Sequence, residues 1–357
     1  MGVASLRKHV IELPKRVVVG EGILEEVPRY ISELDLGRRV VLLSGPSATR
    51  SIALRVRQSL EDRHFEVCEF IVENASIETV RRVLDYAKEC KPELVVGVGG
   101  GKVIDVAKFL ARDLGVALVS IPTAPSHDGI CSPFASIKGL DRPTSVKCVM
   151  PTLVVADIDV ISLAPRRLIL AGCGDLIGKL TAVLDWRLAH RLRGEYYGEY
   201  AASLALLSAK HVLRLYEEFS AKTIPREAVR TLVEALISSG VAMGIAGSTR
   251  PASGSEHMFA HALDIVANYP ALHGEEVALG TIMMLYLHGK NWKRIKRILM
   301  KMGLPTTAKE LGVKDYQIVE ALTRAHEIRP ERYTILGERG LTWDAAEKLA
   351  RKTGVID

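Results

Sequence analysis

Short apolar runs alternate with segments of helical period through the first third of the chain. The run 93–98 (ELVVGV) is continuous, which is typical of a strand buried on both faces. Strands alternating with helices indicate βαβ units and a parallel sheet. We expect strands at 38–44, 65–72, 93–98 and 116–121, and helices at 48–61, 77–90 and 102–114. The segment 10–19 should add a strand or hairpin leading into a helix near 23–34.

The pattern changes near residue 160, and from residue 166 onward almost every stretch has helical period. A chain of 357 residues also suggests two domains. We therefore expect an α/β domain over 1–160 and an all-helical domain over 161–357. Clear helical stretches are 200–219, 226–239 and 277–287, and the small polar residues of 247–257 predict a loop that enters a helix.

The composition is that of a soluble globular protein, with 48% hydrophobic and 25% charged residues. We see no apolar run of the roughly 20 residues that span a bilayer and no signal peptide, so we expect a cytoplasmic protein without membrane insertion. The net charge of +6 could indicate nucleic-acid binding. The basic residues are spread along the chain, which favours solvated helix faces, or attraction of an anionic substrate, and no nucleic-acid partner.

The five cysteines, at 68, 90, 131, 148 and 173, form no CxxC pair and are odd in number. We therefore expect neither a disulfide framework nor a cysteine zinc site. Only three Asn and two Gln are present, and a low content of thermolabile amides fits a protein that works at high temperature.

A glycine turn, Gly99-Gly100-Gly101, joins the buried run 93–98 to the following helix. Glycine allows a phosphate to approach the backbone, and a helix N-terminus supplies free N–H groups and a positive dipole end. The spacing is neither GxGxxG nor a P-loop, so a tight turn without a ligand is the alternative. We interpret the turn as a pyrophosphate site in a Rossmann-like NAD(P)-binding domain. Asp105, in the first helical turn, suits the dipole and could also bind a ribose hydroxyl.

The next strand ends in the segment 122–129 (PTAPSHDG), and ligands of open α/β sheets bind at such strand ends. Hydroxyl groups of Thr123, Ser126 and Ser132 could bind a cofactor or substrate. Asp128 could bind a substrate hydroxyl. The alternative is a polar loop rich in turn-forming residues.

Three histidines and one aspartate suggest a metal site. His257 and His261 (HMFAH) share one face of a helix, His273 follows twelve residues later, and Asp175 begins a helical run. Three N/O ligands with one open position are typical of catalytic zinc, although such ligands also suit iron or nickel. An HxxxH pair alone is more often not a site. Glu256 precedes His257, so the peptidase motif HExxH is absent, and we assign no role to histidines 9, 64, 190, 211, 288 and 326.

Six blocks in order resemble the archaeal sn-glycerol-1-phosphate dehydrogenase family, within the iron-containing alcohol dehydrogenase and glycerol dehydrogenase superfamily. The resemblance covers about residues 10 to 340, in GVGGGKVIDVAKFLA, IPTAPSHDGICSPFASI, PTLVVADIDVI, AGCGDLIGKLTAVLDW, RPASGSEHMFAHALD and LHGEEVALG. It implies a dehydroquinate synthase-like fold with the active site between the two domains. It also implies a homo-oligomer.

The resemblance implies reversible reduction of dihydroxyacetone phosphate to sn-glycerol 1-phosphate with NAD(P)H, for archaeal membrane phospholipid synthesis. Zinc (Zn2+), held by Asp175, His257 and His273, would polarise the C2 oxygen. Asp128 and His261 match substrate-binding and catalytic positions, and Asp175 also matches a substrate contact. With the glycine turn, the cofactor positions are Gly99, Gly100, Gly101, Lys102, Val103, Ile104, Asp105, Thr123, Ala124, Pro125, Ser126 and Ser132.

Two details concern phosphate groups. No acidic residue follows the run 38–44, where Ser44 to Ser47 and Arg50 lie, so we expect NADP(H) to be accepted alongside NAD(H). For the substrate phosphate, Arg250 and the backbone of 253–255 are candidates, although Arg250 could instead form a structural ion pair.

Three alternatives remain open. The first is a glycerol dehydrogenase or another polyol or polyol-phosphate dehydrogenase of the same superfamily. The second is a 3-dehydroquinate synthase-like lyase, which would place more Lys and Arg in the site than we see at 123–132 or 247–276. The third is a nucleotide- or nucleic-acid-binding protein without enzymatic activity, which only the basic net charge supports.

Overall fold

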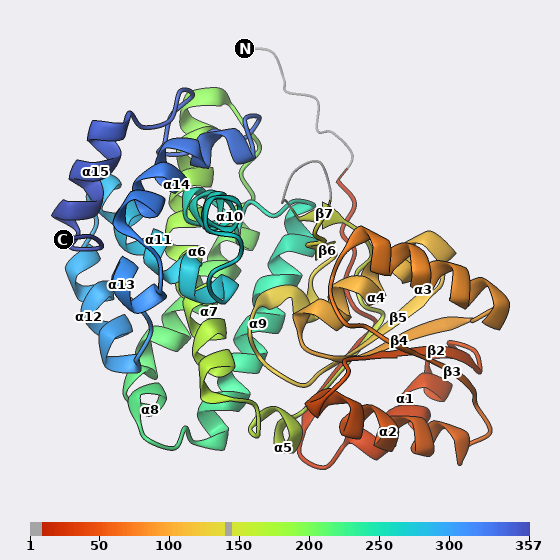
Figure 1. Ribbon diagram of the computed structural model, residues 1–357. Coiled ribbons are helices and arrows are strands. Elements are labelled where there is room, and N and C mark those ends of the chain that lie inside the picture. Colours follow the sequence, from red (N-terminus) through yellow and green to blue (C-terminus); the bar gives the residue numbers. More distant parts are fainter. Residues whose placement is uncertain (1–8, 140–144) are drawn as a thin grey trace.

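The computed structural model describes residues 9–139 and 145–357. An α/β part, coloured red to yellow in Figure 1, lies beside a helical part coloured green to blue. The described chain therefore has two parts in the predicted order, a sheet first and helices afterwards.

The α/β part contains the predicted parallel sheet, with six strands in the order β1-β8-β5-β4-β2-β3. All five neighbouring pairs are parallel. The segment 10–19 forms no hairpin, because its strand pairs only with β8 at one edge of the sheet. The strands are β1 (Arg16–Gly20), β2 (Arg39–Ser44), β3 (Glu66–Ile71), β4 (Leu94–Gly99), β5 (Ala117–Pro122) and β8 (Leu153–Asp157).

Helices cover both faces of this sheet, as the continuous apolar run of β4 predicts (Figure 1). On β2, Val40 and Leu42 pack into one core with η1, α1 and α2, whereas Val41 and Leu43 pack into another with α3 and α4. Alternate residues of one strand thus face opposite layers. The covering helices are η1 (Leu24–Glu26), α1 (Val27–Glu33), α2 (Ala48–Glu61), α3 (Ile77–Cys90) and α4 (Gly101–Leu114).

A short connecting region follows β5. It contains η2 (Asp128–Cys131) and a small antiparallel pair, β6 (Phe134–Ala135) and β7 (Val146–Lys147), before the chain returns to the sheet as β8. All elements after β8 are helices, and we keep the division near residue 160 as our proposed domain boundary. They are α5 (Ile158–Ile161), α6 (Arg166–Arg193), α7 (Glu199–Arg214), α8 (Tyr216–Ser220), α9 (Arg226–Ala246), α10 (Ser255–Ala267), α11 (His273–Leu287), α12 (Trp292–Met302), α13 (Ala308–Leu311), α14 (Asp315–Ile328) and α15 (Trp343–Lys352).

Helix α9 is long and apolar enough, by length and composition alone, to cross a membrane. Its most apolar 18-residue window has a mean hydropathy of 1.4, so our expectation that no such segment exists was too strict. In the structure, 67% of that window is buried inside the protein. The apolar residues of α9 are therefore explained by the core of the helical part.

Strand β8 contributes to two cores at once. Leu153 and Val155 belong to the core beneath α1 and α2, whereas Val154 and Ala156 belong to the large core of the helical part. The side chains of one strand therefore join the sheet to the helices.

The structure corrects our expectation about disulfides, because Cys68 and Cys90 form one. Cys68 lies on the edge strand β3 and Cys90 is the last residue of α3, and their Cα atoms are 6.4 Å apart. This is an ordinary separation for a disulfide. The fold brings this strand and this helix together. The spacing of the two cysteines along the chain did not indicate that contact.

We predict that Cys90→Ser lowers the free energy of unfolding by about 3 kcal/mol, because the disulfide restricts the unfolded chain across 22 residues of sequence. Denaturant unfolding of the oxidised and reduced proteins measures this. The double variant with Cys68→Ser should lose no more than the single variant. An unchanged midpoint for Cys90→Ser would contradict the prediction.

Helices α6 and α11 approach closely where two glycines meet. A Cβ at Gly174 would collide with the carbonyl oxygen of Gly274, and a Cβ at Gly274 would collide with that of Ala171, each closer than the 3.0 Å that real Cβ atoms respect. Each glycine is next to a predicted metal ligand, Asp175 or His273. The absence of two side chains therefore lets the two ligands come together.

We predict that Gly274→Ala forces α6 and α11 apart, lowers the free energy of unfolding by about 1–3 kcal/mol and weakens metal retention at His273. Thermal unfolding and metal content after gel filtration measure the two effects. Gly20→Ala is the matched control, since its Cβ would meet only the flexible Ile23 side chain. Equal behaviour of both variants would refute this account of the helix contact.

Candidate active site

The predicted glycine turn lies at the carboxyl end of β4. Gly99 ends the strand, Gly100 caps α4 and Gly101 is its first residue. The N–H groups of Gly101 and Lys102 have no acceptor inside the helix, and the Lys102 side chain is exposed. The N–H groups of Val103 and Ile104 bond to the Gly100 carbonyl instead, and these two side chains are buried. The turn therefore offers two backbone donors to an anion.

Asp105 and Ser132 are joined by a buried lysine. The Lys108 Nζ lies 3.4 Å from Asp105 Oδ1 and 3.3 Å from Ser132 Oγ, and donates to the Phe134 carbonyl at 2.6 Å. Asp105 also accepts from the N–H of Ser136 at 3.1 Å. The predicted cofactor residues Asp105 and Ser132 thus belong to one hydrogen-bond network centred on Lys108.

The predicted loop after β5 lies beside that turn. The Thr123 N–H donates to the Gly99 carbonyl, and Thr123, Ala124 and Pro125 are buried, whereas Ser126 is half-buried. A Cβ at Gly172 of α6 would collide with the Pro125 carbonyl oxygen. The loop that ends β5 therefore packs directly against the helix that carries Asp175.

His127 stands between the two predicted sites. Its Nε2 lies against the Gly101 Cα, where a Cβ would collide with it, and its Nδ1 accepts from the Gly129 N–H at 2.9 Å. Its charge also contributes to lowering the pKa of His273, after burial and the two other histidines. No spacing in the sequence singles out this histidine, and the structure places it between the glycine turn and the metal ligands.

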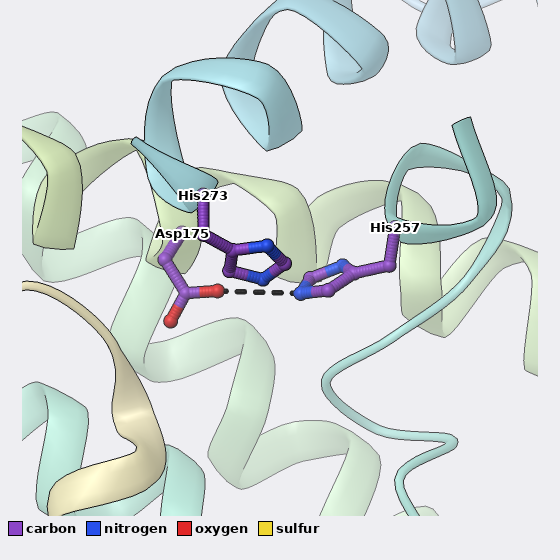
Figure 2. A group of neighbouring side chains, drawn as sticks. All are labelled: Asp175, His257 and His273. Atoms are coloured by element: carbon purple, nitrogen blue, oxygen red, sulfur yellow. Dashed lines mark ion pairs between the residues drawn. The ribbon is translucent and has the colours of Figure 1, made fainter. Parts of the chain in front are cut away.

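The three predicted metal ligands come together in Figure 2, from three helices of the helical part. The ligand atoms of Asp175, His257 and His273 all lie within 4.8 Å of one another. Asp175 Oδ1 is 3.3 Å from His257 Nε2. Two atoms bound about 2 Å from a tetrahedral metal ion lie roughly 3.3 Å apart, so the separation of Asp175 Oδ1 and His257 Nε2 suits two ligands of one ion.

Glu256 orients the His257 ring. Its carboxylate is completely buried and lies 2.7 Å from His257 Nδ1, so that nitrogen carries the proton and Nε2 is left facing Asp175. Gly254 N–H and Thr181 Oγ1 donate to the same carboxylate, each at 2.7 Å. Such a carboxylate behind a histidine is a common support for a metal ligand.

Lys179 connects the metal ligand Asp175 to Asp128. Its fully buried Nζ lies 2.8 Å from Asp175 Oδ1 and 2.9 Å from Asp128 Oδ2. Asp128 N–H donates to Asp175 Oδ2 at 3.0 Å, and Ser239 Oγ donates to Asp128 Oδ2 at 2.8 Å. The structure therefore brings the two predicted substrate-binding aspartates into one ionic network.

The network controls the charges of the site. Burial alone would raise the pKa of Asp175, but Lys179 and His257 outweigh it and hold that pKa well below its usual range. Burial alone would also lower the pKa of His257, but Asp175 and Glu256 outweigh it and raise that pKa above 6.5. Asp175 is therefore ionised in the metal-free protein, and His257 binds its proton more tightly than an ordinary histidine.

His261 lies beside the three ligands without joining them. Its ring stacks on His273 with centroids 5.5 Å apart, and its Nδ1 is 3.6 Å from Asp264 Oδ2. Burial lowers the pKa of His261, and it lowers that of His273 much further. Both imidazoles are therefore neutral near pH 7.

The candidates for the substrate phosphate are already engaged elsewhere. Arg250 is buried, pairs with Glu195 and donates to the Tyr333 carbonyl at 3.0 Å, so it forms the structural ion pair. The N–H of Gly254 bonds to Glu256, and the N–H of Ser255 bonds to Asp185 at 2.7 Å. Neither group is available to an incoming phosphate.

Sequence reasoning missed the supporting residues of the site. Lys179 is four residues after Asp175 on one helix, a spacing that could have suggested an ion pair. Glu256 was considered only because it breaks the peptidase motif, and its position next to His257 does not reveal which way its carboxylate points. Lys108, three residues after Asp105 on α4, had a similar spacing, whereas Ser239 carried no signal.

Known proteins are similar to this chain over nearly its full length. A glycerol-1-phosphate dehydrogenase (NAD(P)+) of Hyperthermus butylicus is 59% identical, over 98% of this chain and 99% of its own length. The proteins of that name from Sulfurisphaera tokodaii and Aeropyrum pernix are 57% and 59% identical, each over at least 98% of both chains.

Solved structures share the fold at low sequence identity. A probable glycerol dehydrogenase of Sinorhizobium meliloti superposes with a TM-score of 0.79 at 22% identity, covering 97% of this chain and 98% of its own. The glycerol dehydrogenase of Schizosaccharomyces pombe gives 0.78 at 21% identity, covering 98% and 94%.

Residues 18–165 also match the family described as iron-containing alcohol dehydrogenase. On these similarities, which extend over nearly the full length of the relatives, the chain belongs to the glycerol-1-phosphate dehydrogenase family.

Proposed function

We propose that this chain catalyses the reversible NAD(P)H-dependent reduction of dihydroxyacetone phosphate to sn-glycerol 1-phosphate. The observation that carries the proposal is the meeting of Asp175, His257 and His273 with Asp128, which follows the predicted cofactor loop. The relatives' shared name supports the choice of substrate. The product would serve archaeal membrane phospholipid synthesis in the cytoplasm, and we propose a homo-oligomer without membrane insertion.

NAD(P)H, when bound, would supply the hydride, and the chain would position it. The open N–H groups of Gly101 and Lys102 would bind the pyrophosphate. Thr123 to Ser126 and Ser132 would line the rest of the cofactor site, and Asp105 would accept a ribose hydroxyl in addition to its bonds from Lys108 and Ser136. Lys108 would hold Asp105 and Ser132 in place.

Zinc held by Asp175, His257 and His273 would supply Lewis-acid stabilisation of the charge that develops on the C2 oxygen. Because Lys179 and Ser239 occupy Asp128 Oδ2, the other oxygen of Asp128 would accept a hydrogen bond from the substrate. His261, which is neutral and whose Nδ1 faces Asp264, would exchange the proton with the substrate oxygen. Asp175 would touch the substrate from the metal side.

We propose that NADP(H) is accepted alongside NAD(H). After β2, Arg50 is the charged residue near the expected ribose position, and it pairs with Glu69 Oε1 of the neighbouring strand at 2.9 Å. Because Arg50 neutralises the Glu69 carboxylate, no unpaired negative charge of that residue would repel a 2′-phosphate. The alternative function, a glycerol or other polyol dehydrogenase, predicts a different substrate preference.

We predict that the purified protein oxidises NADH and NADPH with dihydroxyacetone phosphate at a kcat/KM about 10- to 100-fold above that with dihydroxyacetone, because a buried charged contact is worth about 1.5–3 kcal/mol. Absorbance of the nicotinamide measures both reactions, and chiral analysis of the product checks the stereochemistry. A preference for the unphosphorylated ketone would reject the proposed substrate. Turnover of a substrate without net change in absorbance would favour a lyase.

We predict that chelation abolishes activity and that returned zinc restores it. His273→Ala should retain no metal while still binding NADH, because the N-terminal glycine turn is intact. His211→Ala on α7 is the matched control and should retain metal. Because His257 binds a proton with a raised pKa, protons compete with the metal, so zinc should be lost as pH falls toward and below 6.5. Full zinc content and activity in His273→Ala would refute the ligand assignment.

A further inference from the structure

Two arginines that follow α14 have no acidic partner among the residues that the structure describes. Arg329 is the first residue after the helix, and Arg332 follows three residues later. Within residues 9–139 and 145–357, neither guanidinium forms an ion pair with a carboxylate, whereas Arg250 beside them pairs with Glu195. These two cations are therefore available to an anion.

Their hydrogen bonds go to neutral groups. Arg332 donates to the Ser253 carbonyl at 2.6 Å and to Thr249 Oγ1 at 2.7 Å. Arg329 donates from Nη2 to the Ser145 carbonyl at 3.2 Å, while its buried Nε finds no acceptor in the described part of the chain. An unpaired buried donor on a cation is costly, so a group that binds there with negative charge would be stabilised.

Burial affects both guanidinium groups. It lowers the pKa of Arg332 to about 9 and also lowers the pKa of Arg329, and the neighbouring arginines add to both effects. An incoming anion would reverse these shifts by pairing with the charge.

The position of Arg329 is between the two parts of the molecule. Ser145, which it contacts, precedes β7 in the connecting region that also contains the cofactor residue Ser132. Ser253, which Arg332 contacts, lies just before α10, the helix of His257 and His261. Helices α10 and α14 pack against each other. The Arg329 charge is close enough to contribute to lowering the pKa of His261.

We propose that Arg329 binds the phosphate group of the substrate through Nε, with Arg332 behind it as a second positive charge. This inference rests on the proposed function, because it requires a phosphorylated ketone whose reacting carbon lies near His261. An arginine suits this role, since its planar donors match phosphate oxygens. Arg329 is thus a specificity-determining residue that selects the phosphorylated substrate.

The test compares Arg329→Gln with Arg324→Gln, a matched control on the exposed face of α14. We expect Arg329→Gln to lower kcat/KM for dihydroxyacetone phosphate by about 10- to 100-fold. The kcat/KM for dihydroxyacetone, the KM for NADH and the zinc content should stay within about 2-fold. Arg329→Lys should recover part of the loss, and the control should show none. An equal loss with both ketones, or no loss with either, would overturn the proposal.

Binding of inorganic phosphate gives a readout that does not depend on turnover. Phosphate should raise the melting temperature of the wild-type protein and of Arg324→Gln, but not that of Arg329→Gln. Without phosphate, Arg329→Gln should melt at or above the wild-type temperature, because it removes a buried charge that has no counter-ion within the described residues. A phosphate shift that survives in Arg329→Gln, or a marked loss of stability in its absence, would show a structural arginine instead.

The two readouts separate failure of this inference from failure of the proposed function. If the wild-type enzyme prefers dihydroxyacetone, the proposed function is wrong. Arg329 then has no role in substrate selection, even if the protein still binds inorganic phosphate. If the wild-type enzyme prefers dihydroxyacetone phosphate and Arg329→Gln keeps that preference, only the assignment of Arg329 is overturned.

Discussion

The buried ammonium group of Lys179 is the interaction on which the site depends. It is completely enclosed and lies within hydrogen-bonding distance of two aspartates that come from different parts of the fold. A buried carboxylate without a partner costs several kcal/mol, and Lys179 supplies that partner to Asp175 while it also contacts Asp128. The lysine therefore fixes the position of Asp128 relative to the metal ligand. It also joins the connecting region of the α/β part to α6.

Around this ion network, the ligands are held by close packing and by one carboxylate. The two glycines beside Asp175 and His273 bring α6 and α11 to a distance that no other residue allows. Glu256 then fixes which nitrogen of His257 faces the site. Packing decides how far apart the ligands are, and hydrogen bonding decides their orientation. Close packing and hydrogen bonding are both needed to hold the three ligand atoms around one small cation.

The sequence alone predicted most of the fold and the principal residues of the candidate site. Apolar runs and helical period located the parallel strands and their helices, because both are local signals; the helix 77–90 has the same bounds in the structure. The metal triad followed from residue types and the family resemblance. The disulfide between Cys68 and Cys90, the Glu195 partner of Arg250, the contact of Lys179 with Asp128 and the role of Glu256 could not be predicted. Each depends on which segments meet in space, and a spacing along the chain does not specify that.

Strand β8 has a consequence for how the protein unfolds. Its residues alternate between a core under the sheet and the core of the helices, so neither part can lose its structure without exposing apolar side chains of the other. The α/β part and the helical part therefore contact each other and should also unfold together. A protein built this way should behave as a single folding unit rather than as two modules with separate stabilities, and its active site should persist until the whole chain unfolds.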